Sequence, residues 1–475
     1  MSCRIAFIVP PSQAISLKFV SYQQPINMAY LAAEVIKAGH NAVIWDYGVE
    51  EYNLEDIIDR INGFKPQIIG IHCKTFSIIQ GNELAREIKK SYPQILILVG
   101  GPHSTALPEE TLREFENFDA VAIGEGEKTI VDLCEHIAIG KSLEGVNGIA
   151  IRNGIKIIRT SQRELIADLN ALSYPARQLL PENLYNKRHA SRGISSRGRK
   201  VTEIFTSRGC PGQCIFCAAR LSYGNCVRFR SLDNVLGEVD ECINKFSYDH
   251  IVIQDDTFTL NHERVYGLLE GFRKLGVKSW SCDTRVDAVD KDLIREMARS
   301  NCKKVSLGVE SGSERILKLI KKNISLQQVR NAVRWARSSG IQLVECTFII
   351  GSHPDETNED VSLTWKMIKE LSPDIISVSV IVPYPGTEVY SLMKERGYID
   401  NQDWENFQLI GSKLSWHTKY FSSEELLRLQ RQFINNYYFN FKYIMRSLRR
   451  AKSIKDISYL FKTGLGVLGF LFKKD

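Results

Sequence analysis

The chain has 475 residues, of which 44% are hydrophobic and 25% are charged, and this composition excludes a disordered protein. Its length exceeds what one ordinary hydrophobic core supports, so we expect two or three domains. The formal net charge of +7 belongs to residues 442–475, which contain nine Lys or Arg and two Asp or Glu, so the rest of the chain is neutral overall and is not expected to bind nucleic acid.

The first 145 residues alternate short apolar runs with stretches of helical periodicity. Buried parallel strands are predicted over 5–9, 42–45, 67–71, 95–99 and 120–123, with helices such as 26–38 and 78–90 between them. This alternation predicts an α/β fold of the Rossmann-like, doubly wound kind. Ligands of such domains bind beyond the carboxyl ends of the strands. The residues expected there include Thr75, Gly100, Gly101, His103, Gly124 and Glu125.

The start of the chain is typical of a strand followed by a loop, not of a signal peptide. Eleven cysteines without a secretion signal argue against a disulfide framework, so we expect a protein of the reducing cytoplasm. Six scattered cysteines are predicted to be small apolar core residues: Cys3, Cys73, Cys134, Cys242, Cys302 and Cys346.

Residues 146–198 are predicted to connect the first domain to a second one at 199–400. The connector contains a hairpin at 148–158, a stretch punctuated by prolines at 172–181, and a basic, Gly/Ser-rich segment at 188–200 that we expect to be mobile or to contact the substrate. In the second domain, strands are predicted over 203–206, 251–254, 279–282, 304–308, 342–350 and 375–382. Six β/α units predict a partial (β/α)6 barrel of the TIM type, with its active site at the carboxyl ends of the strands. Residues 401–475 are predicted to form a helical, basic C-terminal region.

Cys210, Cys214 and Cys217 form a C-x3-C-x2-C motif on the loop after the first predicted barrel strand. Thiolates are soft ligands suited to iron–sulfur clusters. Three cysteines can bind three irons of a cubane and leave the fourth iron open for a reactant. The alternatives are three free cysteines, or a zinc site for which Cys226 would be a poorly placed fourth ligand.

This motif, with Phe216 before its last cysteine, resembles the signature of the radical S-adenosylmethionine (AdoMet) superfamily. The resemblance covers about residues 201–390. It implies a [4Fe–4S] cluster whose open iron binds AdoMet, and a reductive cleavage that yields a 5′-deoxyadenosyl radical able to abstract a substrate hydrogen. It also implies an electron donor such as flavodoxin or ferredoxin.

Residues at the following strand ends match positions where that superfamily contacts AdoMet. They are Asp255 and Asp256 beside the amino group, Asp283 and Arg285 at the end of the third strand, Glu310 near the ribose and Gly351 next to the adenine. Two of them have plainer alternatives, because Asp256 could cap a helix and Glu310 could pair with an arginine.

The N-terminal domain resembles the cobalamin-binding domain that is joined to many radical AdoMet enzymes. The matching segments are 27–33, 70–72, 99–103 and 124–127, whose small residues let the backbone approach a flat corrin or its nucleotide tail. The motif that supplies a cobalt-binding histidine in the methionine synthase type is missing, since the corresponding strand end is Asp46-Tyr47-Gly48. His72 and His103 could approach the corrin or be ordinary polar loop residues. The alternative for the domain is a scaffold with a different ligand, although not NAD, because no G-x-G-x-x-G follows the first strand.

The two domains together resemble the group of the anaerobic magnesium-protoporphyrin monomethyl ester cyclase and the hopanoid methylases. The leading hypothesis is a cobalamin-dependent radical AdoMet enzyme that transfers a methyl group to an unactivated carbon of a lipid or other secondary metabolite. An oxidative cyclase or rearranging enzyme of the same fold is the second hypothesis, and a non-catalytic cobalamin or redox sensor is the third. A methylthiotransferase is disfavoured, because the N-terminal part has no second motif of three cysteines.

Helical periodicity over 426–444 is followed by mixed basic and apolar residues up to 474. This tail is predicted either to pack on the barrel with a solvated basic face or to lie at an anionic membrane interface as a peripheral contact. Its longest apolar run, 464–472, is too short to span a bilayer.

Overall fold

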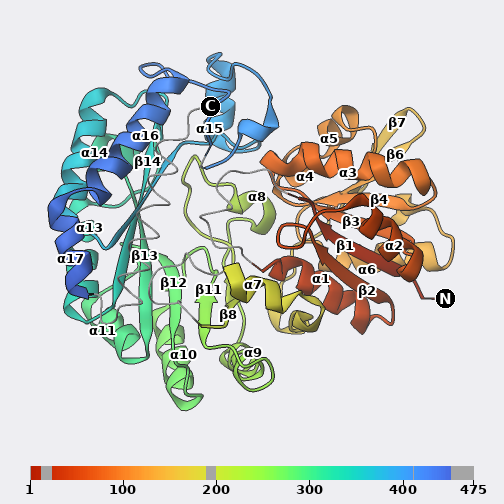
Figure 1. The fold of residues 1–475 in the computed structure, drawn as a ribbon, viewed down its shortest axis with the longest axis horizontal. Helices are drawn as coiled ribbons and strands as arrows, with labels where there is room; N and C mark the ends of the chain where they lie inside the picture. Colours follow the sequence, from red (N-terminus) through yellow and green to blue (C-terminus); the bar gives the residue numbers. More distant parts are fainter. Residues whose placement is uncertain (1, 12–23, 189–198, 410, 451–475) are drawn as a thin grey trace.

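The computed structural model describes residues 2–11, 24–188, 199–409 and 411–450. Most of the basic segment predicted at 188–200, and the tail beyond residue 450, lie outside the described residues. The described chain forms two lobes that lie side by side, the N-terminal lobe on the right of Figure 1 and the barrel lobe on the left. No described helix has the length and apolar character that a membrane crossing requires.

The N-terminal lobe is built on a seven-stranded sheet in the order β2-β1-β3-β4-β5-β6-β7. Its strands are β1 (Arg4–Val9), β2 (Asn41–Asp46), β3 (Ile68–His72), β4 (Leu96–Gly100), β5 (Ala120–Ala122), β6 (Ile149–Asn153) and β7 (Lys156–Arg159). The first five strands are parallel and nearly all apolar, as expected for strands covered on both faces. Each lies within one residue of its predicted bounds, so the doubly wound α/β fold is confirmed.

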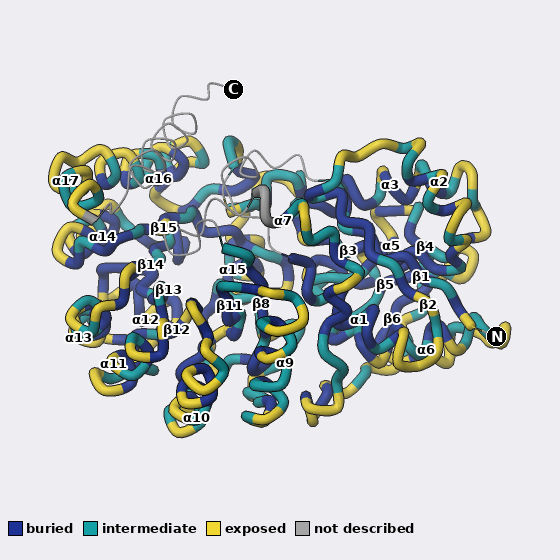
Figure 2. Tube along the Cα trace, turned by 60° about the horizontal axis from the view of Figure 1, so that its bottom comes forward, coloured by how far each residue is buried: buried dark blue, intermediate teal, exposed yellow. Residues whose placement is uncertain are grey.

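Helices cover both faces of this sheet, and its strands form the buried centre of the lobe (Figure 2). The helices α1 and α6 share one apolar cluster with the sheet, and α2, α3 and α5 share another. Their bounds are α1 (Ile26–Lys37), α2 (Leu54–Phe64), α3 (Ile78–Ser91), α4 (Pro102–Ala106), α5 (Pro108–Glu114) and α6 (Glu127–Ala138). The hairpin β6–β7, predicted in the connector, pairs antiparallel with β5 and so extends the sheet past residue 145.

The second lobe contains six parallel strands in the order β15-β14-β13-β12-β11-β8. They are β8 (Val201–Ile204), β11 (His250–Ile253), β12 (Trp280–Arg285), β13 (Cys302–Glu310), β14 (Leu343–Ile350) and β15 (Ile375–Val380). In the described chain β8 and β15 are the two edges and do not pair with each other, so the barrel is open, as predicted. Strand bounds differ from the predicted ones by at most three residues.

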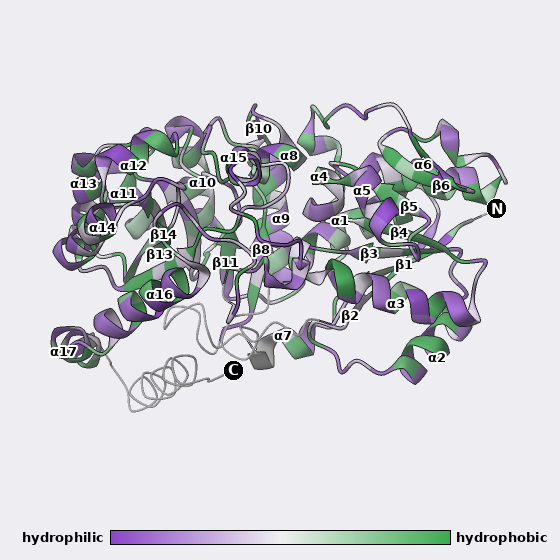
Figure 3. Cartoon of the chain, turned by 90° about the horizontal axis from the view of Figure 1, so that it is seen from above, coloured by the Kyte–Doolittle hydropathy of each residue, from purple (hydrophilic) through white to green (hydrophobic). Residues whose placement is uncertain are grey.

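Seven helices of the described barrel lobe connect or follow these strands and pack against their apolar outer face (Figure 3). They are α9 (Leu232–Asn244), α10 (His262–Lys274), α11 (Lys291–Arg299), α12 (Glu314–Leu319), α13 (Leu326–Ser338), α14 (Asn358–Leu371) and α15 (Glu388–Glu395). Most begin at a Ser, Thr, Asn or Asp whose side chain accepts a backbone N–H, which is the preferred helix start. Short elements that were not predicted surround the cysteine motif: β9 (Ser207–Arg208), α8 (Ala219–Tyr223) and β10 (Arg228–Phe229).

The C-terminal region packs on the edge of the barrel through α16 (Ser423–Tyr438) and α17 (Phe441–Arg450). The amide of Gln430 donates to the carbonyl of Val378 at 2.9 Å, which fixes α16 on β15. The described residues between 404 and 422 are mostly irregular apart from the short helix η7 (Trp404–Asn406), so the predicted helical character begins later than expected. The short helix α7 (Glu182–Arg188) ends the described connector.

Candidate active site and cofactor pocket

The three motif cysteines lie on the loop between β9 and α8, beyond the carboxyl end of β8. Sγ of Cys210 lies 3.7 Å from Oγ1 of Thr257 and accepts the backbone N–H of Gly212 at 3.4 Å. A Cβ atom added to Gly212 would lie 3.3 Å from Sγ of Cys210 and 3.9 Å from Sγ of Cys214. Gly212 therefore keeps open the space that these two sulfur atoms border. Phe216 is partly buried and packs against the main apolar core.

Two cations act on the thiol of Cys214. Nη1 of Arg285 lies 4.0 Å from Sγ of Cys214, and the Lys322 ammonium is near enough to act on it electrostatically. Burial raises the pKa of the Cys214 thiol, and Lys322 and Arg285 oppose that rise. Burial also raises the pKa of Cys217 to about 11. A metal that binds these sulfur atoms must displace their protons, and the two cations favour the thiolate form of Cys214.

Lys322 is a site residue that the sequence analysis missed. It is buried, and its Nζ lies 2.9 Å from Oε1 of Glu310, whose other oxygen accepts Oγ1 of Thr347 at 3.3 Å. Glu310 has a φ of +68°, which is uncommon outside glycine and marks a bend where β13 ends. The charged partner of Glu310 is thus a lysine and not the arginine considered above. The neighbouring Lys321 binds Glu388 in an exposed pair, so sequence alone does not show which lysine points inward.

The side chain of Asp255 supports the segment that leads into the cysteine loop. Its carboxylate is buried and accepts four hydrogen bonds of 2.5–3.1 Å, from the backbone and hydroxyl groups of Thr206 and Ser207. All of these bonds hold the chain that leads into the cysteine loop, and the contact of this strand end with the AdoMet amino group stays a prediction. Asp256 accepts the backbone N–H of Gly209 in the same segment, while its side chain remains exposed.

The other predicted strand-end residues lie along the same carboxyl edge of the barrel. Arg285 binds Asp287 through two bonds of 2.7 and 2.8 Å and the carbonyl of Lys322 at 2.8 Å. Asp283 is exposed although it lies on a central strand, and Gly351 turns the chain after β14 with a φ of +69°. Gln254, at the end of β11, has a buried side-chain nitrogen without a partner among the described residues. An unsatisfied buried donor at this edge fits a site that binds a polar ligand.

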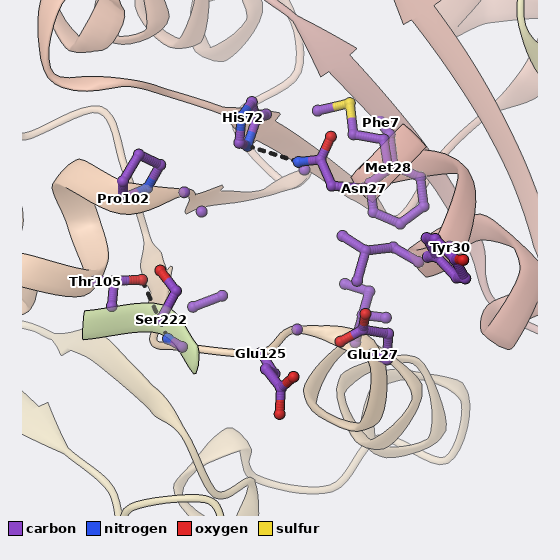
Figure 4. Close-up of a pocket in the computed structure, with 18 of the residues that line it drawn as sticks. Phe7, Asn27, Met28, Tyr30, His72, Pro102, Thr105, Glu125, Glu127 and Ser222 are labelled. Carbon is purple, nitrogen blue, oxygen red and sulfur yellow. Dashed lines mark hydrogen bonds between the residues drawn. The ribbon is translucent and has the colours of Figure 1, made fainter. Parts of the chain in front are cut away.

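A cavity of about 980 Å³, counted with its open mouth, lies between the carboxyl edge of the first sheet and the barrel segment that carries the cysteines. Figure 4 shows it: Phe7, Met28 and His72 approach from the N-terminal lobe, and Ser222 of α8 approaches from the other side. Residues on both sides of the cysteine motif, Arg208 before it and Tyr223 after it, belong to the lining.

Glycines form much of the wall that belongs to the first sheet: Gly70, Gly100, Gly101, Gly124 and Gly126. Gly101 has a φ of +115°, and a Cβ atom there would lie 2.4 Å from the carbonyl oxygen of Cys73. Gly124 has a φ of +75°, and its N–H donates to Oγ1 of Thr105 at 3.1 Å. A bare backbone wall with apolar residues opposite it suits a large flat ligand.

The predicted residues of this domain do not all reach the cavity. Gly100, Gly101, Gly124 and Glu125 line it, and so does His72, which lies 3.3 Å from the amide nitrogen of Asn27. His103 does not: its ring is buried against Trp404 at 4.9 Å between centroids, and neither ring nitrogen has a partner among the described residues. Thr75 is buried in the short helix η2 (Thr75–Ser77), which packs on η7, and is also outside the lining. The structure thus places His103 and Thr75 away from the cavity wall, and their contact with a cofactor stays a prediction.

Burial makes both histidines of this region weak bases. Burial and, for His72, the nearby Lys74 lower the pKa of His72 and of His103 to about 4. Both side chains are therefore neutral at neutral pH. His72 can contact a ligand of the cavity as an uncharged ring.

Comparison with known proteins agrees with this geometry. Residues 204–368 match the Radical SAM superfamily, and residues 13–134 match the B12 binding domain. An uncharacterized methyltransferase of Pyrococcus horikoshii is 31% identical over 456 residues, which cover 96% of this chain and 94% of that protein. The anaerobic magnesium-protoporphyrin IX monomethyl ester cyclase of Rubrivivax gelatinosus is 25% identical, over 86% of this chain and 72% of that protein.

The fold is also that of a solved structure, the cobalamin-dependent S-adenosylmethionine radical enzyme OxsB with aqua-cobalamin bound. That similarity has a TM-score of 0.74 at 16% identity and covers 99% of this chain and 72% of that chain. The chain belongs to the cobalamin-dependent radical SAM family, and it is an enzyme of that family. Its cofactors are a [4Fe–4S] cluster, AdoMet and cobalamin.

The residues present fit these groups. The thiols of Cys210 and Cys214 border the space that Gly212 leaves open, and two cations act on the thiol of Cys214. The glycine wall of the cavity leaves room for a flat ring, and Gln254 offers an unsatisfied donor at the barrel edge. The thiols thus suit the cluster, the bare backbone of the glycines suits the corrin ring, and the barrel edge suits AdoMet.

Proposed function

We propose that this enzyme transfers a methyl group to an unactivated carbon of a small-molecule substrate. The observation that carries the proposal is the shared wall described above, because Arg208 and Tyr223 flank the cysteine motif and also line the glycine-walled cavity. Chemistry that starts at the cysteine loop can thus reach a ligand of the cavity. The similarity to an uncharacterized methyltransferase over nearly the whole chain supports methyl transfer.

Each residue has a proposed role. Cys210, Cys214 and Cys217 hold three irons of the cluster, and Arg285 and Lys322 supply positive charge for the AdoMet carboxylate. The remaining proposed AdoMet contacts are Phe216, Gln254, Asp255, Asp256, Asp283, Glu310 and Gly351. The proposed cobalamin contacts are the cavity residues Gly100, Gly101, Gly124, Glu125 and His72. When bound, AdoMet and the cluster supply a 5′-deoxyadenosyl radical, and cobalamin supplies the methyl group.

Product analysis of the anaerobically reconstituted enzyme tests this proposal. Methyl transfer consumes one AdoMet to methylate cobalamin and another to generate the radical, so S-adenosylhomocysteine and 5′-deoxyadenosine should accumulate together in a cell extract that contains the substrate. Cys214→Ala should abolish both products, whereas the control Cys226→Ala, at an exposed cysteine outside the motif, should retain them. Retained 5′-deoxyadenosine in Cys214→Ala would contradict the cluster assignment.

An oxidative cyclase is the second candidate, favoured by the similarity to the protoporphyrin ester cyclase. A cyclase should form 5′-deoxyadenosine without S-adenosylhomocysteine. The ratio of these two products therefore decides between the two candidates without knowledge of the substrate.

We also propose a cytoplasmic location and a flavodoxin or ferredoxin as electron donor. All eleven cysteines are free thiols. Eight of them are buried, Cys210 and Cys217 are partly buried, and Cys226 is exposed. Free thiols suit a reducing compartment. Reduction of the purified enzyme by photoreduced flavodoxin, followed in the visible spectrum, tests the choice of donor.

The helix α17 supports a peripheral membrane contact. Tyr443 and Arg446 fix the helix to carbonyl groups before β15, while Phe441, Ile444 and Leu448 are 74%, 40% and 42% exposed. Basic residues beside an exposed apolar ridge favour an anionic lipid surface. Removal of residues 454–475 and, separately, Phe441→Ser in the full chain should each reduce sedimentation with anionic liposomes. Unchanged binding in both variants would exclude the contact.

A further inference from the structure

Arg208 lies two residues before Cys210, and its side chain crosses to the N-terminal lobe. Its Nη1 donates to Glu125 at 2.8 Å and its Nη2 donates to Glu127 at 2.5 Å. All three side chains are buried, with 5–7% of each residue exposed. A guanidinium held by two buried carboxylates keeps one geometry far more firmly than an exposed ion pair does.

The same guanidinium contacts aromatic rings from both lobes. Its carbon lies 5.6 Å from the ring centroid of Tyr30, on α1, and 5.6 Å from that of Tyr223, on α8. Arg208, both rings and both carboxylates line the large cavity. A ligand in the cavity therefore contacts a wall that contains the Arg208 guanidinium and its partners.

The backbone between Arg208 and Cys210 has little freedom to move. Gly209 has a φ of +94°, and a Cβ atom there would lie 2.4 Å from the carbonyl oxygen of Cys226. Asp255 fixes the two residues before Arg208, and Asp256 accepts the N–H of Gly209. A shift of Arg208 is therefore passed to Cys210 and is not absorbed by a flexible loop.

We propose that Arg208 is a positioning residue that couples the cavity to the cysteine loop, so that a ligand in the cavity and the cluster on the cysteines stabilise each other. The inference rests on the proposed function, which assigns the cavity to cobalamin and Cys210, Cys214 and Cys217 to the cluster. Coupling between two sites is reciprocal. Filling the cavity should therefore slow the loss of iron from the cysteine loop.

Iron release from the holoenzyme to a chelator, with and without saturating hydroxocobalamin, tests this coupling. Arg208→Lys keeps the positive charge but cannot bridge two carboxylates as the planar fork does. Arg230→Lys is the matched control, because Arg230 is also buried and pairs with Glu238 but does not line the large cavity. We expect hydroxocobalamin to slow iron release about fivefold or more in the wild type and in Arg230→Lys, and less than about twofold in Arg208→Lys.

Equal protection in the wild type and Arg208→Lys would overturn the inference, and so would an absence of protection in a wild type that binds both cofactors. If Arg208→Lys does not retain its cluster on purification, Glu127→Gln replaces it, since this change weakens one of the two bridges. Reduced protection is then the expected result, and full protection overturns the coupling. A wild type that holds iron but does not bind hydroxocobalamin would instead contradict the proposed function.

Discussion

At the scale of single residues, Glu356 is a buried acid at the end of the barrel sheet. It is 1% exposed and accepts the backbone N–H groups of Gly351 and Ser352. These bonds hold the turn after β14, where the positive φ of Gly351 redirects the chain. Burial raises the pKa of Glu356 to about 8, so the folded protein keeps it protonated at neutral pH.

Glu356→Gln should make stability less dependent on pH. The folded pKa lies above the value of about 4.3 in an unfolded chain, so the stability that the bound proton provides is complete below that value and is lost as pH rises through about 8. The amide is neutral throughout, so the variant should gain on the wild type by up to about 1.4 kcal/mol per pH unit over this window. Urea unfolding of both proteins between pH 5.5 and 8.5 measures the difference. Parallel profiles would show that Glu356 titrates as an ordinary carboxylate.

The sequence predicts single residues well where the chemistry is local. Cys210, Cys214 and Cys217 lie within eight consecutive residues, so their spacing predicts a metal site without knowledge of the fold. Carboxylates at strand ends are different, because their partners come from distant segments. Asp255 finds its donors at the end of β8, and Glu310 finds Lys322 beyond α12, and neither pairing can be recognised from position in a strand.

At the scale of elements, two glycines of the cavity wall differ in what surrounds them. A Cβ atom at Gly101 would meet the carbonyl oxygen of Cys73 at 2.4 Å, whereas one at Gly124 would meet nothing within 4 Å. Both have positive φ angles, so both substitutions carry backbone strain. Only the first also forces the end of β4 away from β3.

Gly101→Ala should therefore destabilise the protein by about 2 kcal/mol or more and weaken hydroxocobalamin binding. Gly124→Ala should cost about 1 kcal/mol from backbone strain alone. Thermal unfolding and equilibrium titration with hydroxocobalamin measure the two effects. Equal losses in the two variants would show that the close approach of Gly101 to Cys73 has no influence.

Element type and order follow from the sequence, because apolar runs of four to eight residues alternate with helical periodicity through both lobes. Three short elements around the cysteine motif cannot be predicted in this way. The strands β9 and β10 have two residues each, α8 has five, and none can show a period. The hairpin β6–β7 was recognised, but its pairing with β5 depends on a tertiary contact that its own residues do not specify.

At the scale of the whole molecule, a second buried ion network joins the lobes. Glu238 of α9 is fully buried and binds Arg177 of the connector at 2.5 Å and Arg230. Tyr30 of α1 donates to the same carboxylate at 3.4 Å. One charge thus connects the N-terminal lobe, the connector and the barrel.

Glu238→Ala leaves two buried guanidinium groups without their carboxylate partner and should cost about 3–5 kcal/mol. Glu241→Ala is the control, because Glu241 lies one turn further along α9 and pairs with the exposed Lys245, a contact worth about 0.5 kcal/mol or less. Urea unfolding of the holoprotein measures both changes, and limited proteolysis of the connector reports whether the lobes separate. A loss below about 1 kcal/mol in Glu238→Ala would show that the network does not hold the lobes together.

The sequence predicts both lobes and both cofactor classes, but not how the lobes meet. The meeting surface depends on Arg177, Arg208 and Arg230, whose carboxylate partners lie between 8 and 83 residues away along the chain. No local pattern distinguishes these arginines from those on the surface. The cavity that we assign to cobalamin exists only because this surface brings α8 and the cysteine loop to the edge of the first sheet.

The central claim is that the three cysteines leave one iron of a cubane open for AdoMet. Electron paramagnetic resonance of the anaerobically reconstituted and reduced protein, recorded before and after addition of AdoMet, tests this claim most directly. We predict a [4Fe–4S] signal that changes shape when AdoMet is added and that is missing from Cys214→Ala. Bound zinc in place of iron, or a cluster signal that AdoMet leaves unchanged, would contradict the account.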